Sequence, residues 1–477
     1  MFHPLAGQGG SRYHTVGMKR GIAAAFVVLA AGAAAAVAYT AAARDTEYRR
    51  LVAAGEAALA GGQTSVAIEA FSGAIALNPD SMLAHLKRGE TYRRHGDLKA
   101  AFRDLRDASD LDPSATRPLE QLGDVSLALS RPDRAAERYA AYVQLDDRSP
   151  RVLYKLALAQ YRAGQPALAL RSVRRALALD DRLADAHYLA GLCLAAQGQA
   201  ADARKALERS VDLQPAFIPA REALATTYRN SGRHADATEQ LEALAALDRG
   251  RPARLIALGL EYADARRTDL AVATLGRAAE RFPDNVDVYA TLGEVWLRIA
   301  VDTGDGVALR KALEALRTAV VRGGSSRELA LYGRALLVAG DTSAALRSLR
   351  EAATKLPVAP ATLLDLATAA ERLGDRQAAR DALQRHIALL AGSTPPTSVV
   401  RHLGDLSLAL GDTSDAVHWW RRAATGTSDV ALLVQLAQAE SRVGDYDAAR
   451  RTVARAVALA PADTAATRLQ KLLGTKN

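Results

Sequence analysis

The residue types that most often carry catalysis or bind metals are sparse in this chain of 477 residues. It has nine His, and no two of them lie three or four residues apart, so neither an H-E-x-x-H motif nor another helical ligand pair is present. His85 and His187 are predicted to be packing residues. Cys193, the one cysteine, stands between Leu192 and Leu194 without a nearby His or cluster of cations, and it is predicted to be a buried, inert thiol.

Other motifs give no sign of chemistry. The segment 302–306, Asp-Thr-Gly-Asp-Gly, faintly resembles a calcium loop but lacks the later Glu and the alternation of ligands, so we expect a widened turn. The sequence contains no P-loop, no dinucleotide fingerprint and no G-x-S-x-G nucleophile elbow. We therefore predict a protein that is not an enzyme and that uses no cofactor, no bound metal and no small-molecule substrate.

Small residues recur along the chain with a period of 34, which is the signature of a repeat architecture. One series is Gly55, Gly89, Gly123, Ala157, Gly191, Ala225, Gly259 and Gly293. Twelve positions after the first seven of these lie Ala67, Ala101, Ala135, Ala169, Ala203, Ala237 and Ala271. Each period also holds two apolar stretches with the spacing of a helix. Two helices per period, packed closely through these small residues, are predicted.

Gly-Asp pairs separate the two helical stretches in several periods. They are Gly96-Asp97, Gly340-Asp341, Gly374-Asp375, Gly411-Asp412 and Gly444-Asp445. Glycine can adopt the left-handed conformation that ends a helix, and an aspartate can cap the helix that follows. We expect each pair to form the turn of a helix hairpin.

The pattern closely resembles the tetratricopeptide repeat (TPR) family. The first repeat, 48–81, carries Gly55, Ala67, Phe71 and Ala74 and closes with Pro79. The resemblance implies an all-α fold, a right-handed superhelical α-solenoid of about twelve helix hairpins over 48–463. The repeats are 48–81, 82–115, 116–149, 150–183, 184–217, 218–251, 252–285, 286–325, 326–359, 360–393, 397–427 and 430–463. The eighth contains an insertion of roughly seven residues, and 464–477 is predicted to be a capping helix.

An uncharged apolar segment, 21–43, precedes the repeats, with Lys19 and Arg20 before it. Its 23 residues are long enough for one transmembrane helix. A cleavable signal peptide fits as well, with Ala36-Val37-Ala38 as the small-residue cleavage site. Residues 1–20 are predicted to be a disordered tail, and either Met1 or Met18 is the start. Both alternatives place the repeats outside the cytoplasm, because the basic residues tend to remain inside.

The charge points to no particular partner. The chain has 62 Lys and Arg against 53 Asp and Glu, a net charge of +9, but the two signs alternate along almost every segment. A repeat protein that reads RNA needs one column of base-reading residues and a basic stripe. Neither is present, so we predict no nucleic-acid partner.

In TPR arrays the first helix of each repeat lines the binding groove, and the resemblance places eight residues there. They are Glu120, Asp124, Arg151, Tyr154, Leu158, Tyr161, Tyr188 and Leu192. We hypothesise that a peptide or helix of a partner protein docks along a strip of Tyr154, Tyr161 and Tyr188, because tyrosines give rigid amphipathic contacts. The alternative is that these tyrosines only pack between adjacent helices.

Together these expectations describe a non-enzymatic protein-protein interaction scaffold of the bacterial cell envelope. It would be a single-pass inner-membrane protein with an extracytoplasmic TPR domain, or a secreted, periplasmic protein if a signal peptide is removed. The alternative function is an accessory subunit of an envelope enzyme complex, such as one for polysaccharide synthesis or export. Both rest on the family resemblance.

Overall fold

The computed structural model describes the backbone of residues 13–390 and 394–475, and side chains from Val27 onward. This part of the chain is helical throughout and contains no strand. The helices are α1 (Tyr13–Ala60), α2 (Thr64–Leu77), α3 (Met82–His95), α4 (Leu98–Leu111), α5 (Thr116–Ala128), α6 (Pro132–Leu145), α7 (Pro150–Arg162), α8 (Pro166–Leu179), α9 (Ala184–Ala196), α10 (Ala200–Leu213), α11 (Ile218–Asn230), α12 (His234–Leu247), α13 (Pro252–Asp264), α14 (Thr268–Arg281), α15 (Val286–Thr303), α16 (Gly306–Arg322), α17 (Ser326–Ala339), α18 (Thr342–Ala352), α19 (Pro360–Arg372), α20 (Arg376–Leu389), α21 (Thr397–Ala409), α22 (Thr413–Ala423), α23 (Val430–Arg442), α24 (Tyr446–Leu459) and α25 (Thr464–Gly474).

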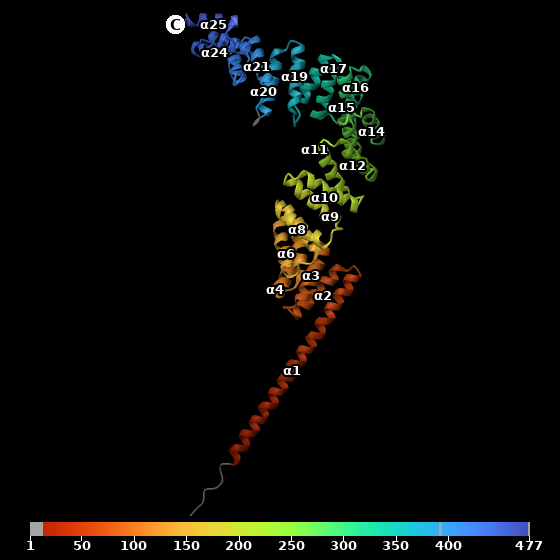
Figure 1. Ribbon diagram of the computed structural model, residues 1–477. Helices are drawn as coiled ribbons and strands as arrows, with labels where there is room; N and C mark the ends of the chain where they lie inside the picture. Colours follow the sequence, from red (N-terminus) through yellow and green to blue (C-terminus); the bar gives the residue numbers. More distant parts are fainter. Residues whose placement is uncertain (1–12, 391–393, 476–477) are drawn as a thin grey trace, which may run out of the picture. The chain divides into compact units, whose positions relative to one another are not determined.

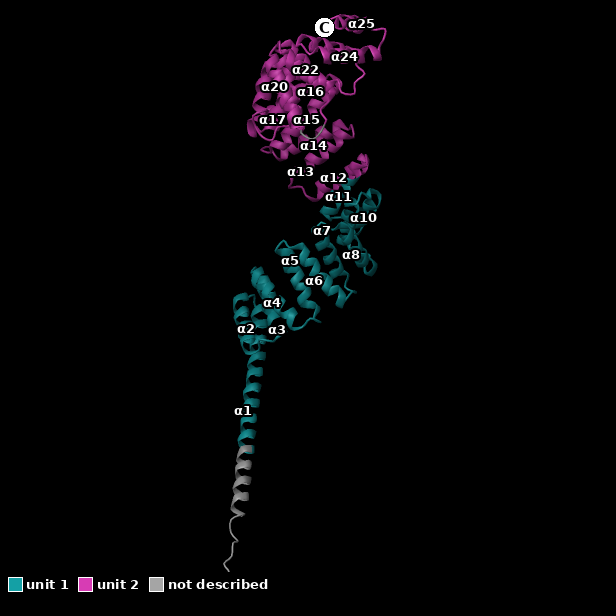
Figure 2. Cartoon of the chain, turned by 90° about the vertical axis from the view of Figure 1, so that its left-hand side faces the viewer, with its two compact units in different colours: residues 1–227 teal, residues 228–477 magenta. Residues whose placement is uncertain are grey.

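Within each unit, an odd-numbered helix is followed by an even-numbered one with which it forms a hairpin (Figure 1). We call the odd-numbered members first helices and the even-numbered members second helices. Eleven such hairpins lie within the described parts of the two units, α11 and α12 are the twelfth pair in chain order, and the predicted all-α repeat fold is confirmed. The chain divides into two compact units, residues 1–227 and 228–477, with the boundary inside α11 (Figure 2).

Each hairpin closes where a small residue of the first helix meets a large side chain of the second. A Cβ atom added to Gly123 would lie 2.3 Å from the ring of Tyr139, and one added to Gly55 would lie 2.6 Å from Phe71. The two partners are 16 positions apart in both hairpins. Gly89, Gly191 and Gly259 meet Leu105, Leu207 and Leu275 in the same way. The alanines that flank these crossings, Ala67, Ala101, Ala135, Ala203 and Ala271, are fully buried.

The Gly-Asp turns form as the sequence predicts. Gly96 has φ of 91° and ends α3, and the side chain of Asp97 accepts a hydrogen bond of 2.9 Å from the backbone N–H of Ala100. Gly340 and Asp341 repeat this arrangement between α17 and α18. Only a residue that tolerates positive φ can end the helix in this way, and the carboxylate satisfies an N–H that would otherwise lack a partner.

The insertion in the eighth repeat does not widen the turn, and that prediction is wrong. It lengthens both helices instead: α15 has 18 residues and α16 has 17, against 13 and 14 in the preceding hairpin. Gly293 therefore meets Leu316, 23 positions on, where the other pairs are 16 apart. Gly304 ends α15 with φ of 71° and Asp305 caps α16. Gly304 and Asp305 form the same kind of tight turn as in the other hairpins. The inserted residues therefore extend both helices, and the turn comes about one helical turn later along each of them.

Helix α1 joins the apolar segment to the first repeat without a break. It runs for 48 residues, from Tyr13 to Ala60, so the predicted separation between 21–43 and 48–81 is absent. Residues 13–20 are helical, which corrects the disordered tail predicted for 1–20; residues 1–12 lie outside the described part. Every side chain from 27 to 46 is exposed. Among the described residues, α1 is the one helix long and apolar enough to cross a membrane.

At the other end, α25 lies over the last hairpin and contacts α24 and α23. Ala466 and Leu473 are buried against that hairpin, whereas Leu472 is 56% exposed. The helix ends within the segment 464–477 for which a cap was predicted, and residues 476–477 lie outside the described part.

Candidate functional site

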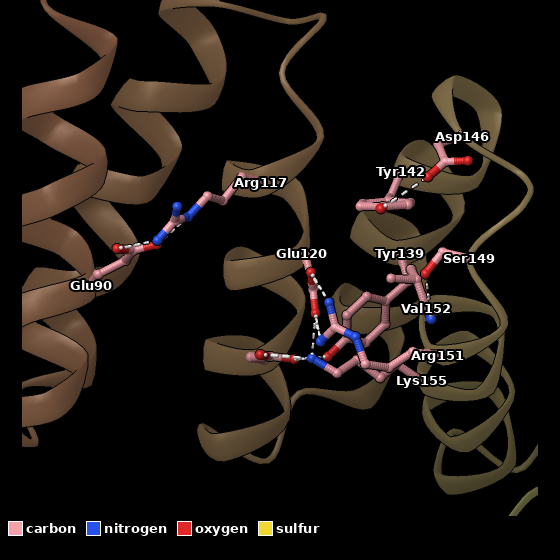
Figure 3. A network of polar contacts seen from close by, with 11 residues as sticks. Glu90, Arg117, Glu120, Tyr139, Tyr142, Asp146, Ser149, Arg151, Val152 and Lys155 are labelled. Carbon is pink, nitrogen blue, oxygen red and sulfur yellow. Dashed lines mark hydrogen bonds and ion pairs between the residues drawn. The ribbon is translucent and has the colours of Figure 1, made fainter. Parts of the chain in front are cut away.

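The acidic residues predicted for the groove are held by basic residues of the next repeat. Glu120 of α5 accepts hydrogen bonds from both Arg151 and Lys155 of α7, the latter at 2.7 Å (Figure 3). Lys155 also reaches Asp124, at 2.7 and 2.9 Å, and Asp124 accepts a bond of 2.6 Å from the hydroxyl of Tyr139. These contacts join two successive first helices and a buried second-helix side chain. They fix the spacing of the third and fourth repeats.

This network sets the charge state of its members. Burial raises the pKa of Glu120, but the hydrogen bonds from Lys155 and Arg151 outweigh that effect and hold the pKa below its usual value. Burial also raises the pKa of the Tyr139 hydroxyl, and its bond to Asp124 acts in the same direction. Glu120 is therefore a charged residue, 8% exposed, whose charge is already compensated.

Similar ion pairs link first helices elsewhere in both units. Glu56 pairs with Lys87 at 2.6 Å and Glu90 with Arg117 at 2.7 Å in unit 1; Asp264 pairs with Arg298 at 2.8 Å and Glu294 with Arg327 at 3.1 Å in unit 2, where a hydrogen bond of 2.6 Å also joins Glu371 and His402. Sequence reasoning missed this ladder. Its signal is a basic residue about 31 positions after an acidic one, a spacing visible only once the period has been found.

The predicted tyrosine strip lies on α7 and α9, and its side chains are half-buried. Tyr154 and Tyr161 pack against the buried cluster between these helices, as does Leu158. Tyr188 meets the ring of Phe217 edge-on, with 5.3 Å between ring centroids. Burial raises the pKa of both Tyr154 and Tyr188. The tyrosines thus combine packing between helices with a partly exposed face.

The remaining predicted groove residues differ in exposure. The side chain of Arg151 is 64% exposed, although it is paired with Glu120. Leu158 and Leu192 are half-buried, and Asp124 is half-buried. The structure brings Glu120, Asp124 and Arg151 together in one network, and it places the tyrosines and leucines next along the same first-helix face.

In unit 2 the first helices form two pockets that sequence reasoning did not find. One, of about 490 Å³, lies along α13, α15 and α17; the other, of about 370 Å³, lies between α17 and α19. Leu331 and Arg334 line both pockets, so the two adjoin each other. No local motif could have revealed them, because their walls come from several repeats.

One group of side chains among the described residues has metal-ligand spacing: His85, Asp104 and Asp107. Both oxygens of Asp104 accept hydrogen bonds from Arg88, at 2.6 and 2.8 Å, and Asp107 accepts one of 2.9 Å from Arg106. The Nε2 atom of His85 lies 3.0 Å from the carbonyl oxygen of Pro79. Guanidinium groups thus supply the positive charge that these carboxylates need, and the group ties α3 to α4.

Cys193 is fully buried in α9, and burial raises its pKa to about 11. A thiol with a raised pKa carries little thiolate at neutral pH and is a poor nucleophile. His187 lies 2.9 Å, through Nε2, from the carbonyl oxygen of Asp181 and is half-buried. Both residues serve the packing of the fifth repeat.

Comparisons with known proteins agree with this architecture. A family model described as "Tetratricopeptide repeat" matches residues 52–116, 256–300 and 332–394. A model described as "Anaphase-promoting complex, cyclosome, subunit 3" matches residues 133–210. Among curated proteins, none matches the chain.

Several solved structures are similar to part of the chain. MamA is 27% identical, with 34% of this chain and 94% of that chain covered and a TM-score of 0.33. YrrB, described as a TPR protein with an unusual peptide-binding site, is 22% identical, with coverage of 40% and 98% and a TM-score of 0.36. PilF of Pseudomonas aeruginosa is 19% identical, with coverage of 45% and 97% and a TM-score of 0.37.

The family follows from features that agree at three levels. The sequence repeats every 34 residues, each period folds into a hairpin closed by a small residue, and the family model matches three separate stretches of the array. The chain contains about twelve repeats and is a member of the tetratricopeptide repeat family.

Proposed function

We propose that this chain is a non-enzymatic protein-protein interaction scaffold of the bacterial cell envelope. Helix α1 holds it at the inner membrane, or directs its export if the apolar segment is cleaved. Partner segments dock on the face formed by the first helices. The proposal rests above all on α1, whose apolar residues are uncovered and which continues directly into the repeats.

The exposure of α1 carries a large free-energy cost in water. Val27, Val28 and Leu29 are 68%, 71% and 70% exposed, and no described residue packs on them. Each large apolar side chain gains about 1.5–3 kcal/mol when it is fully buried. A bilayer supplies that burial, and a helix in a bilayer also needs no outside partner for its backbone.

The orientation follows from the flanking charges. Lys19 and Arg20 precede the apolar segment, and basic residues next to a membrane span tend to stay in the cytoplasm. The repeats then lie outside it. Only Arg44 to Glu47 separate the apolar segment from the first repeat, a rise of about 6 Å along a helix. The array would begin directly at the membrane surface.

Partner binding is assigned to the first-helix face for two reasons. In unit 1, the half-buried tyrosines 154, 161 and 188 offer aromatic surface that needs little further ordering. In unit 2, the pockets along α13–α19 provide concave surface. Both arrangements suit a peptide or helix of a partner protein.

Membrane fractionation of the full-length chain with a C-terminal epitope tests the localisation. We expect the chain in the membrane fraction, resistant to alkaline extraction, with the epitope accessible to protease in spheroplasts. If the segment is cleaved, the chain is instead periplasmic and N-terminal sequencing gives Tyr39 as its first residue. An intact N-terminus on a chain found in the cytosol would contradict the proposal.

A charge placed in the apolar segment provides the matched test. Leu29→Arg is expected to move the chain out of the membrane or block its export, since an Arg near the middle of a span costs about 2.5–3.5 kcal/mol. Val66→Arg makes the same kind of change at an exposed site of α2. It should leave localisation unchanged.

A further inference from the structure

The insertion in the eighth repeat builds one wall of the larger pocket in unit 2. The seven residues 301–307 are all exposed, and two of them, Val301 and Asp302, line the pocket. The side chain of Val301 is 59% exposed and faces a surface that includes Leu260 and Leu297. Val301 thus adds apolar surface to the lining of this pocket.

The adjoining smaller pocket has a mainly apolar lining and one poorly compensated charge. Ala330, Leu331 and Val358 contribute to its lining, together with Asp365 of α19. The side chain of Asp365 is 25% exposed, and its nearest cation is Nε of Arg334, at 3.9 Å. Burial raises the pKa of Asp365, although Arg334 opposes the shift. The carboxylate is therefore less well stabilised than the other acids of this face.

The other charged residues around the two pockets are largely balanced. Arg298 pairs with Asp264 at 2.8 Å, and Arg327 pairs with Glu294 at 3.1 Å. Arg334 is 60% exposed, so water can solvate its guanidinium. Arg229 and Asp302 also line the larger pocket and are opposite in charge. The group that gains most from a new ionic partner is Asp365, since it is the least solvated and has only a distant cation.

A basic side chain suits this site because it joins an apolar stem to a charged end. The stem of a Lys or Arg can lie along Leu331 and Val358 while its end reaches Asp365. Leu331 and Arg334 line both pockets, so an extended segment that crosses these two residues would contact both. An apolar residue close to the basic one would then pack against Val301.

We infer that the first-helix face of α15, α17 and α19 is a docking groove for an extended segment of a partner protein that carries a Lys or Arg near an apolar residue. The basic side chain binds Asp365 and the apolar one packs against Val301. This inference rests on the proposed scaffold function and names the chemistry of its partner.

Fluorescence anisotropy with the full-length chain in detergent tests the inference. The probes are three pools of labelled twelve-residue peptides, random except for a fixed Leu and, two positions away, a fixed Lys, Gln or Glu. We expect the Lys pool to bind at least about tenfold more tightly than the Gln pool, a difference of about 1.4 kcal/mol. The Glu pool should bind most weakly.

Three variants separate the contribution of Asp365 from that of the inserted residues. Asp365→Asn should abolish the preference for Lys, whereas Asp381→Asn, the same change on the exposed face of α20, should preserve it. Replacing residues 300–308 by Gly-Asp restores the usual spacing of 16 positions between Gly293 and its leucine partner and removes the wall formed by Val301 and Asp302. That variant should bind all pools several-fold more weakly but still prefer Lys. It tests the groove independently if Asp365→Asn fails to fold.

Three results would overturn the inference: equal binding of the Lys pool to Asp365→Asn and to the unchanged chain, a preference for Glu, or binding of no pool. The first two would leave the scaffold proposal standing, because peptides would still dock on the array. If no pool bound, the scaffold proposal would still be tested separately, by photocrosslinking of the intact chain in membranes.

Discussion

At the scale of single residues, close packing decides which positions of each repeat must be small. Tyr139 is fully buried, its ring occupies the space a side chain at Gly123 would need, and its hydroxyl is fixed by a bond of 2.6 Å to Asp124. The ring therefore cannot move aside without breaking a buried hydrogen bond. The close contact itself recurs with Phe71, Leu105, Leu207 and Leu275, and it explains why a small residue and a large one recur together 16 positions apart.

Alanine at two glycine positions should have opposite effects. Gly123→Ala places a Cβ atom 2.3 Å from Tyr139 and is expected to lower the free energy of unfolding by about 1–3 kcal/mol. Gly276→Ala in α14 has no atom within 4 Å of its new Cβ and should raise the free energy by up to about 1 kcal/mol, because alanine favours helix. Urea unfolding followed by circular dichroism measures both. Equal losses would refute the role of the close contact.

At the scale of helices, ion pairs between first helices hold neighbouring repeats in place. Glu120 is the most connected acid of this kind, since it accepts bonds from two cations of α7. Such a network depends on every member, because removal of one leaves a buried charge without a partner. It also makes the junction of the third and fourth repeats sensitive to pH.

The contribution of Glu120 should disappear in acid. Its pKa is lowered in the folded chain, so its stabilisation is complete above the unfolded value, about 4.3, and is lost as the pH falls through the lower folded value. Glu120→Gln should cost about 1–3 kcal/mol at pH 6 and progressively less below pH 4. Urea midpoints measured from pH 6 to pH 3 check this.

Glu69→Gln, at an exposed carboxylate of α2, is the control and should behave like the unchanged chain throughout this range. A cost of Glu120→Gln that persists unchanged at pH 3 would show that the side chain stabilises the fold through packing alone.

The regular parts of these elements could be predicted from the sequence, whereas the irregular parts could not. Gly340 favours the left-handed conformation and Asp341 favours the cap position, so these two residue types at these positions are enough to predict the turn. The widened turn predicted at 302–306 is wrong because the capping signals of Gly304 and Asp305 allow either a wide turn or two longer helices. Packing of the buried Ala300 and Ala308 favours the latter.

The candidate site was less predictable for a related reason. The alignment of the repeats placed Arg151 and Tyr154 on the first-helix face, but a single sequence does not show that Lys155 compensates Glu120 and Asp124. The pocket at Asp365 depends on side chains of two neighbouring repeats and the loop between them. Such features depend on distances between hairpins, which a periodic pattern does not specify.

At the scale of the whole molecule, α1 unites two roles that the sequence separates. The apolar segment and the first helix of the first repeat form one element, so in the proposed membrane-anchored form the array follows the membrane span without a flexible linker. The array itself offers a first-helix face in each unit. The protein that we propose is thus a membrane-proximal scaffold whose binding surface is built by successive repeats.

Site-specific photocrosslinking of the intact chain in its own membrane tests the central claim most directly. A photoreactive residue replaces Tyr161 or Val301 on the first-helix faces, or Lys205 or Arg317 on the exposed faces of second helices, and adducts are identified by mass spectrometry. Docking of partner proteins on the first-helix face predicts protein adducts from the first-helix positions and none from the second-helix positions. Adducts from Lys205 or Arg317 alone, or from no position, would contradict it.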